Sequence, residues 1–143
     1  MPLPGDRPLL DFATLKLRWS PNQYLVCPPD RCAARPHREA PVFDADADRL
    51  EAAVLAVAQR QPRVEQLGGD SVERAYEFVE TTKGFGFPDH ISVHVWPLPD
   101  GRSTLGIYSR SRYGWSDMGV NRRRVERWLA GIRKELGLRR ERG

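Results

Sequence analysis

Hydrophobic residues recur at helical spacing near the C-terminal end of the chain, and this is the clearest pattern in the sequence. Five of them share one face of a helix: Val125, Trp128, Leu129, Ile132 and Leu136. Side chains three, four and seven positions apart line one side of an α-helix, so the pattern predicts an amphipathic helix. Asn121 suits its N-cap, with Val120 and Val125 as a hydrophobic staple around it. Gly137 suits its end, and we expect residues 138–143 to fray.

A second helical pattern lies in the middle of the chain. Its apolar stripe consists of Leu50, Ala53, Val54, Val57 and Ala58. Asp46 is a suitable N-cap, because its short carboxylate can accept hydrogen bonds from the free backbone N–H groups of a first helical turn. Pro62 cannot continue a helix, so we expect this one to run from Asp46 to about Gln61.

Alternation of apolar and polar residues predicts strands elsewhere in the chain. The predicted strands are 15–19, 64–67, 72–80, 91–96 and 104–109. Glycine and proline predict a hairpin turn at 68–70 and a second turn at 99–101. Residues 81–89 are rich in glycine and predict a loop, with Phe85 and Phe87 packed into the core.

A long segment between the first predicted strand and the first predicted helix has little periodicity. Residues 20–45 hold five prolines, which are Pro21, Pro28, Pro29, Pro36 and Pro41. Proline disfavours both a helix interior and a central strand, so we expect a long proline-rich surface loop. Ordered loops of this length are uncommon and are often functional.

The order of these elements predicts the fold class. One strand, the long loop, a helix, four strands and a final helix are typical of an α+β protein. We expect a single domain over residues 1–143, with an antiparallel sheet of about four to five strands packed on two helices. Trp96 and Trp128 are large enough to fill the space between the sheet and the helices.

Basic residues are concentrated at the C-terminal end. The net charge is +4, but residues 109–143 hold 11 Lys and Arg against 4 Asp and Glu, whereas the first 108 residues hold 12 against 15. This asymmetry favours anionic partners such as phosphates or acidic protein surfaces. An arginine-rich helix that only keeps a protein in solution has the same composition, so both interpretations stay open.

The sequence also bears on compartment and on metal binding. It has no apolar run of about 20 residues, as a membrane-spanning helix needs, and Asp6 and Asp11 interrupt any signal peptide. We therefore expect a cytoplasmic protein with no membrane partner, in which Cys27 and Cys32 are free or buried thiols. The spacing C-x4-C-x4-H that ends at His37 matches zinc sites poorly, so we expect no metal and no cofactor.

Three segments of the chain carry a resemblance to a known family. They read SPNQYLVCPP near the N-terminus, FPDHISV in the middle and SRSRYGWSDMGVNRRRVERWL at the end. With these segments the chain resembles the uncharacterised family catalogued as domain of unknown function 1499, which occurs in bacteria and, in related form, in plastids. The resemblance implies a compact single domain and no established activity, cofactor or catalytic residue. One departure is Val79-Glu80-Thr81-Thr82, where the family pattern implies an arginine.

The run from Ser109 to Asn121 is the strongest candidate for a site, because it joins the last predicted strand to the last predicted helix with arginines, serines and glycines. A helix N-terminus attracts anions, and arginine offers bidentate contacts to phosphate or carboxylate. We expect an anion-binding site formed by Arg110, Arg112, Asp117, Asn121, Arg122, Arg123 and Arg124. The same residues also suit a purely structural turn, in which Asp117 accepts backbone hydrogen bonds and the arginines pair with nearby carboxylates.

Two other functions stay open at this point. An enzyme such as a small hydrolase needs a base beside a nucleophile, and the candidates are Ser109, Ser111, Asp89 and His94. Nucleic-acid binding rests only on charge and on aromatic residues beside arginines, without a known binding motif, so we do not expect a nucleic-acid partner. The sequence favours a non-catalytic domain that binds an anionic small molecule or an acidic protein surface.

Overall fold

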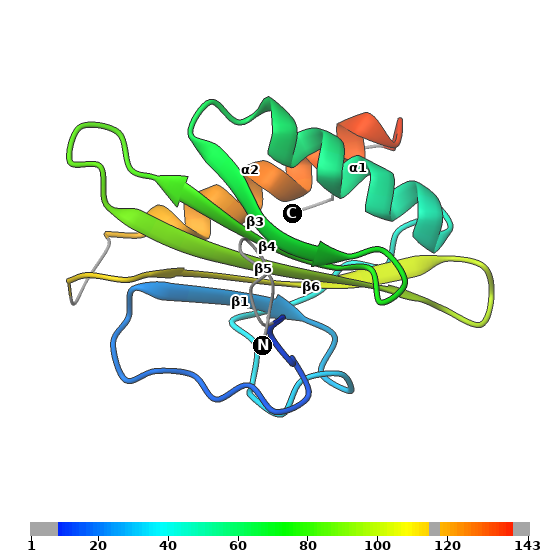
Figure 1. The fold of residues 1–143 in the computed structure, drawn as a ribbon. Coiled ribbons are helices and arrows are strands. Elements are labelled where there is room, and N and C mark those ends of the chain that lie inside the picture. The colour runs from blue at the N-terminus through cyan, green and yellow to red at the C-terminus, as the bar shows by residue number, and fades with distance from the viewer. Residues whose placement is uncertain (1–8, 115–117, 139–143) are drawn as a thin grey trace.

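The computed structural model describes residues 9–114 and 118–138, which fold into a sheet with helices on one face (Figure 1). The elements in chain order are β1 (Gln23–Cys27), β2 (Arg38–Glu39), α1 (Ala47–Arg60), β3 (Val64–Asp70), β4 (Ala75–Thr81), β5 (Pro88–Pro97), β6 (Ser103–Ser111) and α2 (Val120–Glu135). Both helices lie on the same face of the sheet, and the N-terminal segment and the β1–β2 loop lie on the other. The α+β class is therefore confirmed.

The sheet is larger than predicted and is mixed. Its six strands lie in the order β2-β1-β6-β5-β4-β3. Neighbouring strands are antiparallel except β1 and β2, which pair in parallel through Val26 with Arg38 and Cys27 with Glu39. The expectation of four to five antiparallel strands misses β1 and β2, both of which lie inside the predicted proline-rich loop.

The first strand is predicted at the wrong position. Residues 15–19 are not a strand, and the side chain of Trp19 is 96% exposed. The strand instead lies at β1, between Pro21 and Pro28, where neither proline interrupts the hydrogen bonds to β6. Five residues between prolines are too few for alternation to stand out, because four of the five are buried.

The predicted hairpin turn also lies elsewhere. β3 continues through Gly68, where the register shifts at a bulge, and ends at Asp70. The chain then turns over residues 71–74, and the Asp70 carboxylate accepts hydrogen bonds from the backbone N–H groups of Val72 and Glu73. The glycines therefore lie at and after a bulge in β3, and not in the hairpin turn predicted at 68–70, whereas Asp70 accepts hydrogen bonds within the actual turn.

The local sequence predicts three of the four helix ends closely, and the start of α2 differs. α1 begins after Asp46, whose carboxylate accepts a hydrogen bond from the Arg49 N–H at 2.8 Å, as predicted. α2 begins earlier than predicted, because Gly119 takes the N-cap position with a φ of 82°. Asn121 is therefore inside the first turn and fully buried, and it is not the N-cap. Gly137, with a φ of 73°, ends the helix as expected.

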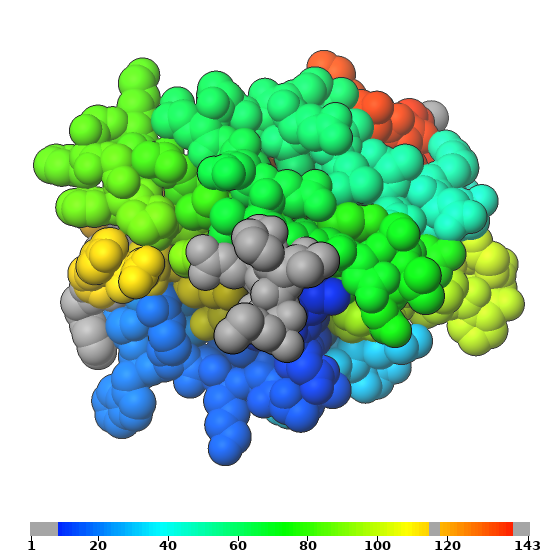
Figure 2. Space-filling model, viewed as in Figure 1, coloured from blue at the N-terminus to red at the C-terminus, as the bar shows by residue number. Residues whose placement is uncertain are grey.

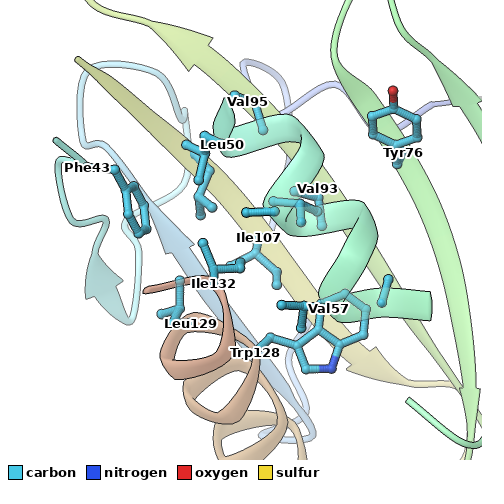
Figure 3. Close-up of a cluster of buried hydrophobic side chains, with 14 of the residues drawn as sticks. Phe43, Leu50, Val57, Tyr76, Val93, Val95, Ile107, Trp128, Leu129 and Ile132 are labelled. Carbon is cyan, nitrogen blue, oxygen red and sulfur yellow. The ribbon is translucent and has the colours of Figure 1, made fainter. Parts of the chain in front are cut away.

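The main core lies between the helices and the sheet (Figure 3). Trp128 from α2, Val57 from α1 and Ile107 from β6 converge there, and each is at most 2% exposed. Trp128 fills the sheet–helix interface as expected, but Trp96 faces the other side of the sheet and contacts Phe12. Burial of each large apolar side chain contributes about 1.5–3 kcal/mol.

Candidate anion-binding site

The first turn of α2 is tied to the sheet by a buried ion-pair network. The Arg124 side chain is 2% exposed, and its guanidinium donates to Glu80 on β4 at 2.8 Å and to Asp89 on β5 at 2.7 Å. Arg127, one turn later, also reaches Glu80 at 3.2 Å. Two arginines and two carboxylates thus balance each other, as buried charges require.

Polar side chains complete this network. Asn121 accepts hydrogen bonds from the Ser109 hydroxyl at 2.6 Å and from Arg124 at 2.8 Å, and its amide donates to the Ser111 hydroxyl at 2.9 Å. The same amide donates to the Asn22 carbonyl at 3.2 Å. The predicted site residues Asn121 and Arg124 are therefore brought together, but in a closed structural contact with partners inside the fold.

A helical pattern could have revealed this contact in the sequence. Asn121 precedes Val125 by four positions and Arg124 precedes Trp128 by four, so both lie on the apolar face of α2. A polar residue on an apolar face needs a buried partner. Glu80, at the position where the sequence departs from the family pattern, is one of those partners.

Arg110 lies on the opposite face of the sheet, because side chains alternate along β6. Its guanidinium donates to the Ser92 hydroxyl at 2.7 Å and packs over the Tyr108 ring, 4.8 Å from the centroid. Glu77 is the nearest carboxylate, at 3.9 Å. Burial lowers the pKa of Arg110 and raises the pKa of Glu77.

Arg110 and Arg112 help to line a shallow hollow on this face, which we call the basic hollow. It measures about 460 Å³ and is lined by Leu10, Leu15, Lys16, Arg18, His90, Tyr108, Arg110, Ser111 and Arg112. Its basic side chains come from three segments: the N-terminal segment, the start of β5 and the end of β6. Sequence reasoning found the two arginines and missed Lys16, Arg18 and His90, since only the topology brings these segments together.

The remaining predicted residues lie outside the basic hollow. Arg122 and Arg123 are exposed on the first turn of α2, and Arg123 donates to the Met118 carbonyl at 2.9 Å. Asp117 lies outside the described residues. The six described residues of the predicted site therefore do not form one pocket: two lie at the basic hollow, two are in the buried network and two are on the helix surface.

The residues proposed for catalysis are separated by the sheet. Ser109 and Ser111 face α2 and bond to Asn121. His94 lies on the other face, where it stacks on Trp96 with ring centroids 4.6 Å apart and burial lowers its pKa. Asp89 is held by Arg124, so the structure does not bring these groups into a nucleophile–base pair.

The cysteines differ from the expectation of free thiols. Cys27, fully buried at the end of β1, and Cys32 form a disulfide. His37 does not join them, because its Nδ1 accepts a hydrogen bond from the Leu25 N–H at 2.9 Å. Over residues 9–114 and 118–138, no cluster of three or more His, Cys, Asp or Glu side chains has a metal-binding arrangement. Within the same ranges, neither helix has the length and hydrophobicity to cross a membrane.

Comparisons with known proteins place the chain beside an uncharacterised family. The family model described as "Protein of unknown function (DUF1499)" matches residues 20–132. No curated protein matches the sequence. The range that the family model matches, residues 20–132, includes the buried network and most of the basic hollow, but it begins after Lys16 and Arg18.

Three solved structures are similar to this chain at low identity and low TM-score. A protein from Nitrosospira multiformis is 14% identical, with a TM-score of 0.49 over 68% of this chain and 92% of that one. Ara h 8.0201 is 14% identical, with a TM-score of 0.47 over 68% and 91%. Protein CV1439 from Chromobacterium violaceum is 15% identical, with a TM-score of 0.41 over 82% and 97%. At these scores the likenesses do not bear on function.

Proposed function

The chain belongs to the DUF1499 family, which has no assigned function, and we propose that the domain binds an anionic group in the basic hollow. The observation that carries the proposal is the gathering of Lys16, Arg18, His90, Arg110 and Arg112 around one hollow. No Asp or Glu is among the described residues that line it. Like charges gathered in a concavity raise the local concentration of counter-ions and favour an anionic ligand.

Two of these cations are held in place by the fold. Arg110 is fixed by the Ser92 hydroxyl and the Tyr108 ring. Arg18 donates to the Asn22 side-chain oxygen at 3.1 Å, and its own backbone is bonded to the Gln23 side chain. Because these two side chains are already ordered, ligand binding costs less side-chain conformational entropy than it would with mobile arginines.

Glu77 is the natural competitor of such a ligand. Its carboxylate accepts hydrogen bonds from the Ser92 hydroxyl at 2.5 Å and from the Leu10 N–H at 3.0 Å, and lies 3.9 Å from Arg110. Burial raises its pKa, so its negative charge is less favourable here than in water. An anion in the basic hollow would supply Arg110 with a better-placed negative charge.

A larger hollow lies along the outer side of α2 and is a weaker candidate. It measures about 730 Å³ and is lined by residues that include Glu126, Leu129 and Arg133. Glu126 already pairs with Arg38 and accepts from the Tyr24 hydroxyl. This hollow is lined by side chains of both charges, and Glu126 is already paired within the fold, so the hollow has no clear preference for an anion.

Calorimetric titration with inorganic phosphate, a nucleoside monophosphate and a dicarboxylate would test the proposal. We expect Arg110→Gln or Arg112→Gln to weaken binding by about tenfold or more, because each removes a charge-assisted hydrogen bond worth about 1.5–3 kcal/mol. Glu77→Gln should tighten binding, since it removes the competing carboxylate. Arg102→Gln is the matched control, because Arg102 is exposed on the β5–β6 turn at the other end of the sheet.

Two results would count against the basic hollow. One is the lack of binding by any of these anions; the other is equal weakening by Arg110→Gln and Arg102→Gln. Binding of an acidic peptide with the same response to Arg110→Gln would identify the anion as a partner's carboxylate. In this proposal the domain has no catalytic activity of its own, and the cytoplasmic location stays a prediction.

A further inference from the structure

Large apolar side chains are exposed together at one end of the sheet. Phe85 is 82% exposed, Phe87 48% and Tyr113 56%. The Phe85 and Phe87 rings stack with centroids 5.6 Å apart, and the centroids of the Phe87 and Tyr113 rings are 6.0 Å apart. The sequence predicts that both phenylalanines pack into the core, and this prediction is wrong. Exposed apolar clusters of this kind mark an interaction surface.

The β4–β5 loop holds the two phenylalanines outward. The Thr82 carbonyl accepts a hydrogen bond from the Gly86 N–H at 3.0 Å, and the Thr82 N–H donates to the Phe87 carbonyl at 2.8 Å. The Thr82 hydroxyl also accepts from the Phe87 N–H at 2.9 Å. Gly84 has a φ of 90°, which few other residues tolerate. The loop is thus a closed, hydrogen-bonded turn that presents its aromatic rings to solvent.

Two neighbouring loops extend the same surface. Trp19, 96% exposed, precedes Asn22, whose amide donates to the Gly114 carbonyl at 2.6 Å beside Tyr113. Met118, 85% exposed, lies just before α2. The pairing of Gln23 with Arg110 and of Asp89 with Ser111 brings these loops to the same end of the sheet. We call this surface the aromatic tip: Trp19, Phe85, Phe87, Tyr113 and Met118. In Figure 2 the light green, yellow and blue loops that carry it project from the same side.

Among the described residues around the aromatic tip, the exposed charged side chains have one sign. The described residues 18–22, 82–88, 112–114 and 118–124 include no Asp or Glu. The exposed cations within these ranges are Arg18, Lys83, Arg112, Arg122 and Arg123. Exposed aromatic residues surrounded by cations match a surface that is apolar inside and negatively charged outside.

We propose that the aromatic tip docks on an anionic lipid bilayer, with its rings at the headgroup level and the surrounding cations against the lipid phosphates. Four of its five side chains are rings, and they protrude from three separate loops, which suits a deformable apolar phase better than the pocket of a rigid partner. Trp and Tyr prefer the membrane–water interface. The expectation of no membrane partner rested on the lack of a spanning segment, and docking on a surface requires none. Arg18 and Arg112 border both the aromatic tip and the basic hollow. None of the apolar side chains of the tip lines the hollow, so the proposal does not depend on the function proposed for it.

Co-sedimentation with lipid vesicles tests the proposal. The full chain should bind vesicles of phosphatidylcholine mixed with phosphatidylglycerol, and bind vesicles of phosphatidylcholine alone far less. Phe85→Ser and Phe87→Ser should each weaken binding by about tenfold, since each removes an aromatic ring from the apolar phase. Lys83→Glu should weaken vesicle binding, and it should not make that binding more sensitive to salt concentration. Val72→Ser is the matched control, because Val72 is 84% exposed on the β3–β4 turn at the other end of the sheet.

Several results would overturn the proposal. They are failure to bind anionic vesicles, equal binding by the Phe85→Ser and Val72→Ser variants, and binding to a single-stranded oligonucleotide that anionic vesicles do not displace. A wild-type dimer in solution that Phe85→Ser dissociates would instead assign the aromatic tip to self-association. Vesicle binding that survives Arg110→Gln, in a protein that has lost phosphate binding, would separate this surface from the basic hollow.

Discussion

Arg124 connects more of the molecule than any other polar side chain that we describe. It lies on α2 and bonds to carboxylates on β4 and β5, and to Ser109 on β6. A buried ion pair adds little stability over an apolar contact, but removing one member leaves the other charges uncompensated. Arg124 therefore fixes how α2 sits on the sheet.

We predict that Arg124→Met destabilises the domain strongly. It leaves Glu80 and Asp89 buried without their main partner, and the expected loss is about 3–5 kcal/mol in the free energy of unfolding. Urea denaturation followed by circular dichroism measures this loss. Adding Glu80→Gln and Asp89→Asn to Arg124→Met should restore part of it, because no buried charge then lacks a partner.

The control is the neighbouring arginine on the same helical turn. Arg122 is exposed, so Arg122→Met should change the free energy of unfolding by no more than about 0.5 kcal/mol. If Arg124→Met were as mild as Arg122→Met, the buried network would not hold α2 in place.

At the level of elements, the sequence predicts best where one pattern extends over many residues. α2 and α1 each repeat an apolar face over several turns, and β5 alternates cleanly, so these elements are predictable. β1 is short and almost wholly buried, and β2 has two residues, so neither has a pattern of its own. β1 forms because β6 offers an edge for pairing, and β2 then pairs with β1, so both depend on the tertiary fold.

The N-terminal segment packs on the face of the sheet opposite the helices, and one of its close contacts is with Gly106 on β6. Gly106 has no side chain, and a Cβ there would lie 3.0 Å from both the Phe12 and the Trp96 rings. Phe12 is 2% exposed in the space that this glycine leaves. Lys16 and Arg18, which line the basic hollow, follow Phe12 in the same segment.

We predict that Gly106→Val displaces the N-terminal segment. Its larger side chain would expel Phe12, with an expected loss of about 1.5–3 kcal/mol of burial free energy. Trypsin should then cut faster at Lys16 and Arg18, and anion binding should weaken because these cations leave the hollow. Limited proteolysis followed by mass spectrometry checks the first result.

A second variant separates this effect from general instability. Phe12→Ala removes the same contact from the other side and should produce the same cleavage pattern. If Gly106→Val left Lys16 and Arg18 as protected as in the wild type, the segment would not depend on this contact.

Across the whole molecule, the two faces of the sheet divide structure from candidate function. The helix face holds the main core and the balanced network around Arg124. The opposite face holds a smaller core, the disulfide and the basic hollow. The sequence predicts that arginines gather near the start of α2, but alternation along β6 sends Arg110 to one face while Arg124 contacts the sheet from the other. Periodicity within one strand was visible; the assignment of its faces needed the neighbouring elements.

The disulfide links the stability of the whole molecule to its compartment. Cys27 and Cys32 close a loop with a sequence separation of 5, and closing so short a loop stabilises a protein by about 2 kcal/mol in the chain-entropy account. We predict that reduction with dithiothreitol lowers the free energy of unfolding by about that amount, and that Cys32→Ser does the same without reductant. Reductant should not change the Cys32→Ser variant further, which is the control.

Disulfides persist in oxidising compartments and are rare in the cytosol, so alkylation of thiols in acid-quenched cells distinguishes the two locations. Two free thiols would support the predicted cytoplasmic location, and a protected pair would contradict it; unfolding that is insensitive to reductant would show that the bond does not stabilise the fold.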